Sequence, residues 1–569
     1  MIPPWEKIIE TKKCRLSGQE FVITDKDLQF YEKMSPVFGG KQYLIPTPTL
    51  CPYERTRRRF CFRNERALYR RKCDKSGKDI IAIYSPDKPQ TLYDSKIWWS
   101  DDWSPFEYWS PVNFETIFFT QVASLIKNVP ALPIINAKSE NSDYTNYSNE
   151  NRDSYMSVWT SGCENALFCY RVTKSRNLMD CYDLGESDHC YECSECTRLS
   201  NCNWCFSCHN SNYLYACYDC QNCNNCIGCS NLRGKSFCVN NVPVTKEAYE
   251  AELLKMLWKT WADSLRHIRY SVPQRCFQQT NTENCLGDNL TNCQHCYESY
   301  TLKNSEHCRY SQVWTQGIHS MDVNFFDFSD HQLEITNTIK SYGGIFGALN
   351  WYCQNAAYSY SCFNAIHVFW CVWLKKWSHC ILNKVYAVQE YETLCSRIID
   401  HMNATGEWWE FFPHELSPFG YNETVAQEYY PLAEAEVKAK WWSWYHEPGK
   451  TFDGQSIVPF PISEYDEKIV GFETAQQNID TVLNWIIQCE VTGKPFKIIR
   501  QELVFYIEHS LPIPTKHPDQ RHKERMSLIN NRALFENTCS ECRSPIISTY
   551  VPGWPETVLC EECYRKLVY

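Results

Sequence analysis

The chain has 569 residues, a formal net charge of −10, and 34 cysteines. This charge excludes a surface that binds nucleic acid or anionic membranes over its whole extent. No run of residues approaches the ~18 apolar positions of a membrane-spanning helix. The first residues, MIPPWEKIIE, lack the apolar segment of a signal peptide, so we expect a cytoplasmic protein whose cysteines are thiols or metal ligands rather than disulfides.

The two ends of the chain are copies of each other. Residues 14–31 match residues 489–506 at an offset of 475, and residues 52–89 match residues 518–555 at an offset of 466. The matched positions include Cys14 with Cys489, Tyr31 with Tyr506, Arg55 with Arg521, Arg59 with Arg525 and Cys73 with Cys539. We therefore predict the same two-part module at residues 1–100 and 485–569.

The second copy ends with the strongest motif in the chain. Cys539 and Cys542 form one pair, seventeen residues follow, and Cys560 and Cys563 form a second pair. Four thiolates at this spacing are typical of a closed tetrahedral Zn²⁺ site, which leaves no coordination position for catalysis. We expect about one structural Zn²⁺ per chain, because the first copy keeps only Cys73 of the four.

The first part of each module resembles the zinc-ribbon, or treble-clef-like, family. The segments CRLSGQEFVIT, DLQFYEKM and PTLCPYERTRRR carry this resemblance. It implies ligand positions at Cys14, Ser17, Cys51 and Glu54, and in the second copy at Cys489, Thr492, His517 and Gln520. Of these, Cys14, Cys51, Cys489 and His517 are the residue types that bind zinc well. The whole arrangement is similar to large cysteine-rich proteins of uncultivated bacterial lineages, a resemblance that implies no activity.

A strongly basic segment lies inside the first module. Residues 55–72 contain eight arginines and one lysine, and they are predicted to be helical. One interpretation is RNA binding, with Arg55, Arg57, Arg58, Arg59 and Arg63 on phosphate oxygens. The alternative is a solvated helix face that pairs with acidic groups of the same chain.

The centre of the chain repeats every three residues. Between Cys163 and Cys238 lie fifteen cysteines, and every gap between them is a multiple of three. This period fits neither a helix nor a flat strand, and it predicts a β-solenoid that turns a corner every few residues. A second lattice contains Cys293, Cys296, Cys308, Cys353, Cys362, Cys371, Cys380 and Cys395, and Cys285 lies in another phase. The two halves, 161–243 and 271–385, correspond at an offset of 142.

Two roles are open for the solenoid cysteines. They share their lattice with Leu, Val, Ala and Ser, which favours thiols that fill a narrow core. The spacing of Cys190, Cys193 and Cys196, repeated at Cys202, Cys205 and Cys208, also suits zinc between the turns or an iron–sulfur cluster.

The remaining segments are predicted as connectors. They are an aromatic and helical stretch at 101–160, a capping helix at 244–270 with Thr245 as N-cap, and a helix with an aromatic connector at 386–484. The fold class is therefore mainly β with helices: a duplicated, cysteine-lined β-solenoid flanked by small zinc-ribbon-like modules.

No catalytic motif is present in the sequence, and no small-molecule substrate is indicated, so enzyme activity is left open and is not favoured. The leading hypothesis is a non-catalytic, zinc-binding scaffold with a protein partner or self-association. The alternatives are an RNA- or ribonucleoprotein-binding protein that uses residues 55–72, and a metal-storage or iron–sulfur protein that uses the solenoid thiols.

Overall fold

The computed structural model describes residue 3 and residues 5–257, 262–448, 457–458 and 479–568. The chain divides into two compact units. Unit 1 comprises Met1–Ile134, Phe277–His446 and Arg532–Leu534, and unit 2 comprises Ile135–Cys276, Glu447–Asn531 and Phe535–Tyr569. Each unit therefore combines one solenoid with the terminal module that lies farther from it in the sequence.

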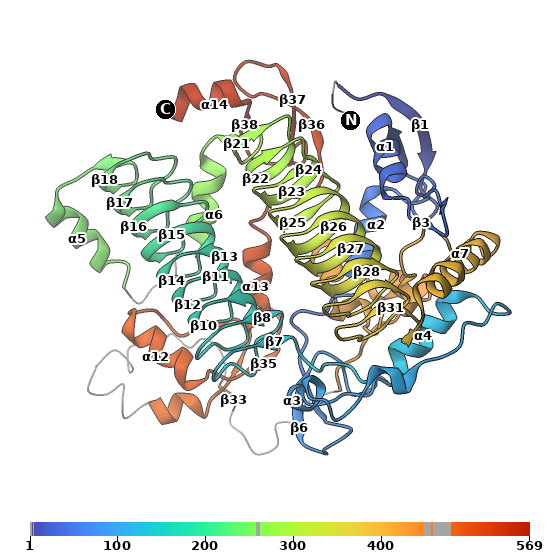
Figure 1. Cartoon of the computed structure of the whole chain (residues 1–569). Helices are drawn as coiled ribbons and strands as arrows, with labels where there is room; N and C mark the ends of the chain where they lie inside the picture. The colour runs from blue at the N-terminus through green and yellow to red at the C-terminus, as the bar shows by residue number, and fades with distance from the viewer. Residues whose placement is uncertain (1–2, 4, 258–261, 449–456, 459–478, 569) are drawn as a thin grey trace. The chain divides into compact units, whose positions relative to one another are not determined.

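Unit 2 contains the first solenoid, a 13-stranded sheet whose strands wind in stacked coils (Figure 1). Its strands are β7 (Asn136–Ala137), β8 (Ser148–Asn149), β9 (Val158–Ser161), β10 (Glu164–Leu167), β11 (Tyr170–Thr173), β12 (Arg176–Met179), β13 (Tyr182–Gly185), β14 (Asp188–Tyr191), β15 (Ser194–Asn203), β16 (His209–Tyr215), β17 (Asn224–Ile227), β18 (Ser236–Val239) and β19 (Val242–Pro243). The coil ends where β19 pairs antiparallel with β18.

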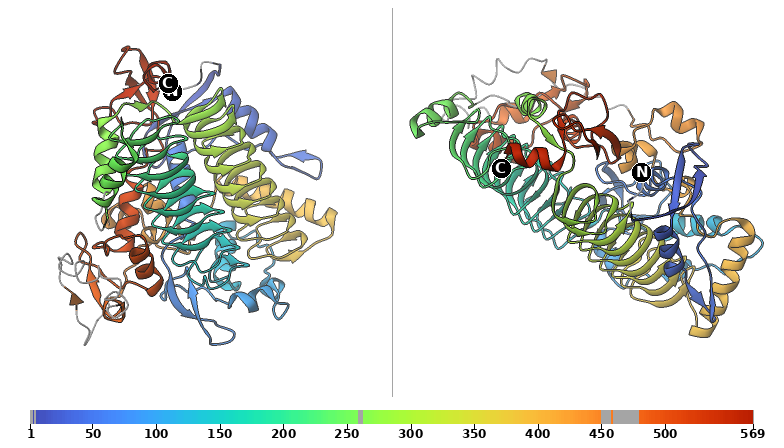
Figure 2. Two further views of the ribbon diagram at one scale, coloured as in Figure 1. Left: turned by 90° about the vertical axis from the view of Figure 1, so that its left-hand side faces the viewer. Right: turned by 90° about the horizontal axis from the view of Figure 1, so that it is seen from above.

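Unit 1 contains the second solenoid, a 12-stranded sheet. Its strands are β21 (Gln279–Glu283), β22 (Leu286–Gln294), β23 (Tyr297–Lys303), β24 (Glu306–Arg309), β25 (Gln312–Thr315), β26 (Ile318–Asp327), β27 (Asp330–Ile339), β28 (Tyr342–Trp351), β29 (Gln354–Ala357), β30 (Ile366–Phe369), β31 (Ser378–Ile381) and β32 (Lys384–Val385). Within each solenoid the successive turns run parallel in every view, as Figure 2 also shows.

The other elements form the terminal modules and the connectors. Unit 1 adds β1 (Ile8–Lys13), β2 (Glu20–Thr24), α1 (Asp25–Met34), β3 (Val37–Phe38), β4 (Lys41–Gln42), α2 (Pro52–Phe60), β5 (Tyr69–Lys72), β6 (Asp79–Ala82), α3 (Ser95–Trp99), η1 (Pro105–Tyr108), α4 (Phe118–Asn128), α7 (Val388–Thr405), η2 (His414–Leu416), η3 (Tyr421–Glu423), α8 (Val425–Tyr429) and α9 (Glu434–Ala439). Unit 2 adds α5 (Lys246–Leu254), α6 (Ala262–Ser271), β20 (Gln274–Arg275), β33 (Ile457–Val458), β34 (Ile486–Gln488), β35 (Pro495–Phe496), α12 (Arg500–Glu508), α13 (Pro518–Met526), β36 (Phe535–Thr538), β37 (Pro545–Ser548), β38 (Val558–Leu559) and α14 (Glu561–Val568). Among these described helices, none is both long and apolar enough to cross a bilayer.

One turn of the solenoid takes twelve residues and has four corners. Ala166 pairs with Leu178 and Leu178 pairs with Cys190, so each partner lies 12 residues further along the chain. Every third residue, such as Asn165, Phe168 and Arg171, has a left-handed backbone with φ between 52° and 59°. The residue after each of these corners points inward, which explains the period of three. The predicted cysteine-lined β-solenoid is therefore confirmed.

The inward cysteines do more than fill space, because their thiols pair with the backbone of the neighbouring turn. The Sγ of Cys202 accepts the amide of Leu214, in the next turn, at 3.4 Å, and its single proton has two acceptors within reach, the carbonyls of Ser200 at 3.3 Å and of Ser211 at 3.8 Å. A serine at the same kind of position does likewise, since the Oγ of Ser211 accepts the amide of Cys223 at 3.0 Å. Burial raises the pKa of Cys202, and it raises that of Cys353 to about 12, which keeps these two thiols protonated as donors.

Replacing Cys202 by Ala is expected to cost more stability than replacing it by Ser. Alanine leaves the buried Leu214 amide without an acceptor, at a cost of about 1–3 kcal/mol, whereas a serine hydroxyl can accept the same bond. Urea unfolding of the two variants measures the difference. Equal destabilisation by both substitutions would contradict this role of the thiol.

The same pairing rule extends the first solenoid toward the N-terminus. Residues 136–160, expected to belong to a connector, form turns of the coil from β7 onward. Polar residues continue the inward lattice here, and they are all buried: Ser142, Thr145, Ser148, Asn151, Ser154, Ser157 and Thr160. The predicted boundary at 161 is therefore too late, because the inward lattice continues before Cys163 through polar residues and without any cysteine.

The expected change of phase near Cys285 is a bulge at the start of the second solenoid. Leu286 pairs with Tyr297, 11 residues on, whereas Gly287 pairs with Ser299, 12 residues on. A Cβ on Gly287 would lie 1.9 Å from the carbonyl oxygen of Ser299, so only glycine fits.

Gly287→Ala is expected to destabilise unit 1 by about 1–3 kcal/mol, because the Ser299 backbone must move. Gly185→Ala is the matched control in the other solenoid, since its Cβ would meet only side-chain atoms at 3.6 and 3.7 Å. Denaturant midpoints of the two variants provide the comparison. Equal midpoints for both variants would exclude this backbone clash.

Two predicted helices differ from the structure. The basic segment is helical only to Phe60, and β5 continues it as one strand of a hairpin with β6. The capping helix expected at 244–270 is described as two helices, α5 with the Thr245 N-cap and α6, and residues 258–261 lie outside the described part. Cys395 shares the lattice phase but lies in α7, within the helix expected after residue 386. Much of the 386–484 connector, at 449–456 and 459–478, also lies outside the described residues.

Candidate metal centre

Each terminal module contains two lobes, and we use this word for a segment that begins with a cysteine turn and ends with a helix. All four lobes begin with the same turn. The turns start at Cys14, Cys73, Cys489 and Cys539. In each, the carbonyl of the cysteine accepts the amide of the residue four positions later, at 2.8 to 3.0 Å. That residue has a left-handed backbone in every lobe: Gly18, Gly77, Gly493 and Arg543. The duplication in the sequence is therefore a duplication of local structure.

A helix N-terminus completes each lobe. The residues immediately before α2, α3, α13 and α14 are Cys51, Asp94, His517 and Cys560. The amide of Asp94 donates to the Sγ of Cys73 at 3.2 Å, and the amide of Cys560 donates to the Sγ of Cys539 at 3.3 Å. Burial raises the pKa of Cys14 and Cys489, but the amides of Cys51 and His517 are among the hydrogen-bond donors that lower it. The first cysteine of each lobe thus joins the turn to the helix even where no metal set is present.

Within the described part of the chain, only the last lobe brings four ligand atoms together. The sulfur atoms of Cys539, Cys542, Cys560 and Cys563 all lie within 4.8 Å of one another. Those of Cys542 and Cys560 are 3.8 Å apart. Tetrahedral zinc with Zn–S bonds of about 2.3 Å requires sulfur atoms about 3.8 Å apart, so this set fits the ion.

The lobe also prepares its first thiol for deprotonation. Burial alone raises the pKa of Cys539, but amide hydrogen bonds from Cys560, Cys542 and Glu541 lower it to about 6. A thiolate is the form that binds metal. Cys539 is buried and Cys542 is exposed, so an ion could reach the site from solvent.

The first part of the N-terminal module does not assemble a comparable set. Burial raises the pKa of Cys51 to about 11, and its Sγ lies 3.9 Å from the hydroxyl of Ser17. Glu54, at the fourth ligand position, instead pairs with Arg57 at 2.5 Å. Cys14 and Cys51 therefore offer two sulfur ligands in this lobe. Among the described residues, no third metal-binding side chain lies close enough to complete a group with them.

The equivalent part of the C-terminal module is similar. The Nδ1 of His517 accepts the amide of Asp519 at 3.1 Å, and its ring packs against Phe496. Gln520, at the fourth position, donates to Glu524 at 3.0 Å. Cys489 and His517 belong to no group of three ligands among the described residues.

The basic segment docks its own module onto the second solenoid. The Nε of Arg55 lies 2.8 Å from Asp322, and the Nη2 of Arg59 lies 3.2 Å from the same carboxylate. Arg58 bonds Glu334 at 2.9 Å and Glu410 at 2.5 Å. All of these arginines are buried.

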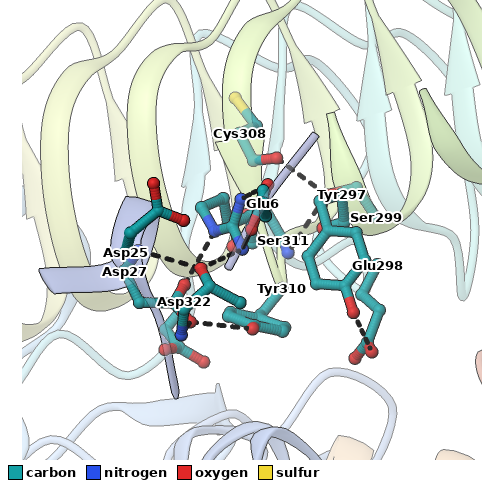
Figure 3. Close-up of polar contacts among 12 residues, drawn as sticks. Glu6, Asp25, Asp27, Tyr297, Glu298, Ser299, Cys308, Tyr310, Ser311 and Asp322 are labelled. Atoms are coloured by element: carbon teal, nitrogen blue, oxygen red, sulfur yellow. Dashed lines mark hydrogen bonds and ion pairs between the residues drawn. The ribbon is translucent and has the colours of Figure 1, made fainter. Parts of the chain in front are cut away.

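The N-terminal module makes a second contact with the same solenoid, close to the first, and Figure 3 shows it. Arg309 of β24 pairs with Glu6 at 2.6 Å and with Asp27 at 2.8 Å. The hydroxyl of Tyr310 donates to Asp27 at 3.4 Å. The N-terminal module is thus attached to its solenoid through buried charge pairs at two neighbouring places.

Unit 2 repeats the arginine contact at the duplicated positions. Arg521 lies 2.6 Å and Arg525 lies 2.8 Å from the carboxylate of Asp180. These two arginines correspond to Arg55 and Arg59 at the offset of 466, and Asp180 corresponds to Asp322 at the offset of 142. Even the ring under the guanidinium is repeated, since Arg521 lies over Phe168 at 5.0 Å and Arg55 over Tyr310 at 5.2 Å.

This arrangement corrects the expectation for the basic segment. The five arginines expected on phosphate oxygens, Arg55, Arg57, Arg58, Arg59 and Arg63, are at most 5% exposed. Arg63 pairs with Glu65, and the others pair with carboxylates of the same unit. The helix face is therefore not open to a phosphate backbone. It pairs with acidic groups of the same chain, as the alternative expected, but it is buried rather than solvated. Its charges stabilise the docking of a module.

Sequence reasoning did not identify the partners of these arginines, and it missed a second group of ligands. Asp180 and Asp322 could have been found from the two offsets taken together, because matched arginines require matched acids. The second ligand group is His319, Asp330 and His331, whose ligand atoms also lie within 4.8 Å of one another. The twelve-residue spacing of His319 and His331 was the available signal.

Comparison with known proteins adds no assignment. No protein-family model matches the chain, and a search of curated proteins finds no match.

Proposed function

We propose that the protein is a non-catalytic scaffold in which one Zn²⁺, bound by Cys539, Cys542, Cys560 and Cys563, holds the last lobe in place. The observation that carries this proposal is that one of four equivalent lobes has a full ligand set. The other three keep the same turn through the hydrogen bond that the cysteine carbonyl accepts from the amide four residues later. Because three lobes form this turn without a full ligand set, a metal in the fourth lobe is expected to stabilise that lobe rather than to catalyse a reaction.

The ligand-bearing lobe is fastened to the first solenoid of unit 2 next to the metal ligands. Strand β38, which ends just before Cys560, pairs with β20 through Gln274 and Arg275. Arg275 pairs with Glu561 at 2.7 Å, and the hydroxyl of Tyr564 bonds Asp219. An ion at the four thiolates would therefore fix α14 and the end of the coil together.

Scaffold function requires a partner, and we propose another protein or a second copy of this chain. Solenoids present long, regular surfaces that suit such binding. All 34 cysteines are free of disulfide bonds, which is consistent with a reducing compartment such as the cytoplasm.

Elemental analysis of protein purified without oxygen tests the metal part of the proposal. We expect about one zinc and no iron per chain. Several metal ions per chain, or bound iron, would instead support metal storage or electron transfer by the solenoid thiols.

Sedimentation and cross-linking of the same preparation test the scaffold part. We expect self-association or a co-purifying protein, and a lone monomer without any partner would oppose it. Bound RNA released by salt would support the ribonucleoprotein alternative.

A further inference from the structure

A row of histidines runs up one face of the second solenoid. His295, His307, His319 and His331 occupy the same corner of four successive turns. Their rings lie 4.9, 5.0 and 5.0 Å apart, which is about the spacing of neighbouring strands. All four have a left-handed backbone, which histidine tolerates better than most residues.

The last step of this row differs from the others. The first two pairs of rings are nearly parallel, with interplanar angles of 3° and 10°, but the rings of His319 and His331 are inclined by 34°. The carboxylate of Asp330 lies at this step. Its Oδ1 is 2.7 Å from the Nδ1 of His331 and 3.8 Å from the Nδ1 of His319.

In this group, the Nδ1 of His319 is buried without an interaction that accounts for it. Its Nδ1 is shielded from solvent and has no hydrogen-bond partner among the described residues. At 3.8 Å it is too far from Asp330 for a hydrogen bond. Ligand atoms about 2.1 Å from a common ion would be about 3.4 Å apart, between the two distances found here.

We propose that His319, Asp330 and His331 form a second metal site, which binds a divalent first-row transition ion through two imidazole nitrogens and one carboxylate oxygen. This donor set suits zinc, nickel, copper or iron rather than calcium or magnesium. Three protein ligands leave coordination positions for water or an added ligand. The site is independent of the four-thiolate lobe, which lies in the other unit.

A cavity gives an ion access to this place. His319 lines this cavity of about 670 Å³, whose wall also includes His295, His307 and Lys33. An ion and a small anionic ligand could approach through this cavity.

Nickel binding to the full-length protein, with the four-thiolate site first filled by Zn²⁺, tests the proposal. Equilibrium dialysis against graded Ni²⁺, followed by elemental analysis, gives bound nickel and zinc per chain. We expect one nickel without loss of zinc. We also expect His331→Ala and Asp330→Asn to weaken nickel binding at least about tenfold.

His379→Ala is the matched control. Its ring stacks on His367 at 5.0 Å in the same unit, but it belongs to no group of three ligands among the residues that the structure describes. Its nickel affinity should equal that of the unsubstituted protein. Unchanged binding in His331→Ala and Asp330→Asn, or nickel that displaces zinc one for one, would overturn the proposal.

A measurement on the unsubstituted chain tests the site without requiring that the variants fold. Diethyl pyrocarbonate modifies accessible imidazoles, and mass spectrometry locates each modified histidine. Ni²⁺ should protect His319 and His331 and leave His379 reactive. Equal reactivity of all three with and without Ni²⁺ would refute the site.

Discussion

Asp322→Ala is expected to lower the free energy of unfolding of unit 1 by about 3–5 kcal/mol. The substitution leaves the guanidinium groups of Arg55 and Arg59 buried without their shared carboxylate. Burying such charges unpaired costs far more than the net gain from the intact pair. Denaturant unfolding followed by hydrogen exchange with mass spectrometry measures the loss and locates it.

The duplicated contact supplies a control with the same chemistry. Asp180→Ala removes the partner of Arg521 and Arg525 and should destabilise unit 2 by a similar amount. Each variant should therefore raise exchange chiefly within its own unit. Asp400→Ala, which breaks an exposed pair with Lys41, should leave the unfolding midpoint unchanged. Equal effects of Asp322→Ala and Asp400→Ala would contradict the proposed importance of burial.

Cys539→Ser is expected to abolish metal binding at the last lobe and to open that lobe. Structural zinc sites of this kind contribute about 10 kcal/mol or more of apparent binding free energy at pH 7, and this energy is coupled to folding. Limited proteolysis should cut within residues 535–568 of the variant but not of the unsubstituted protein. Zinc content should fall by about one ion per chain.

Cys73→Ser is the matched control, because Cys73 occupies the equivalent position in the N-terminal module. The Sγ of Cys73 accepts amides of Ser76 and Asp94, and a serine oxygen can accept the same bonds. We expect unchanged metal content and unchanged proteolysis. A chelator added to the unsubstituted protein should reproduce the proteolysis pattern of Cys539→Ser. Resistance of Cys539→Ser to proteolysis would show that the lobe folds without metal.

The repeat of three residues was sufficient to predict a coil with cysteines inside. It could not predict the length of a turn, because six, nine or twelve residues all preserve the period. The hydrogen-bond register decides this length, and it places Ala166, Leu178 and Cys190 above one another. The four-cysteine site was equally clear from its spacing, since its two ligand pairs are local in sequence.

The partners of the basic segment were beyond local reasoning. Arg55 and Asp322 are separated by 267 residues, so the charge run reads the same whether it faces RNA, water or a carboxylate. The histidine site could not be predicted for a similar reason. His319 and His331 stand twelve residues apart in the sequence, and this spacing acquires a meaning only once a turn is known to take twelve.

The sequence by itself therefore determined the inward lattice, the duplicated modules and the four-thiolate ligands, because each depends on spacing along the chain. Only the tertiary structure decided which solenoid each module joins, that the arginines are buried, and that His319, Asp330 and His331 lie together. These features depend on contacts between distant segments, for which the free energy of burying and pairing charge is decisive.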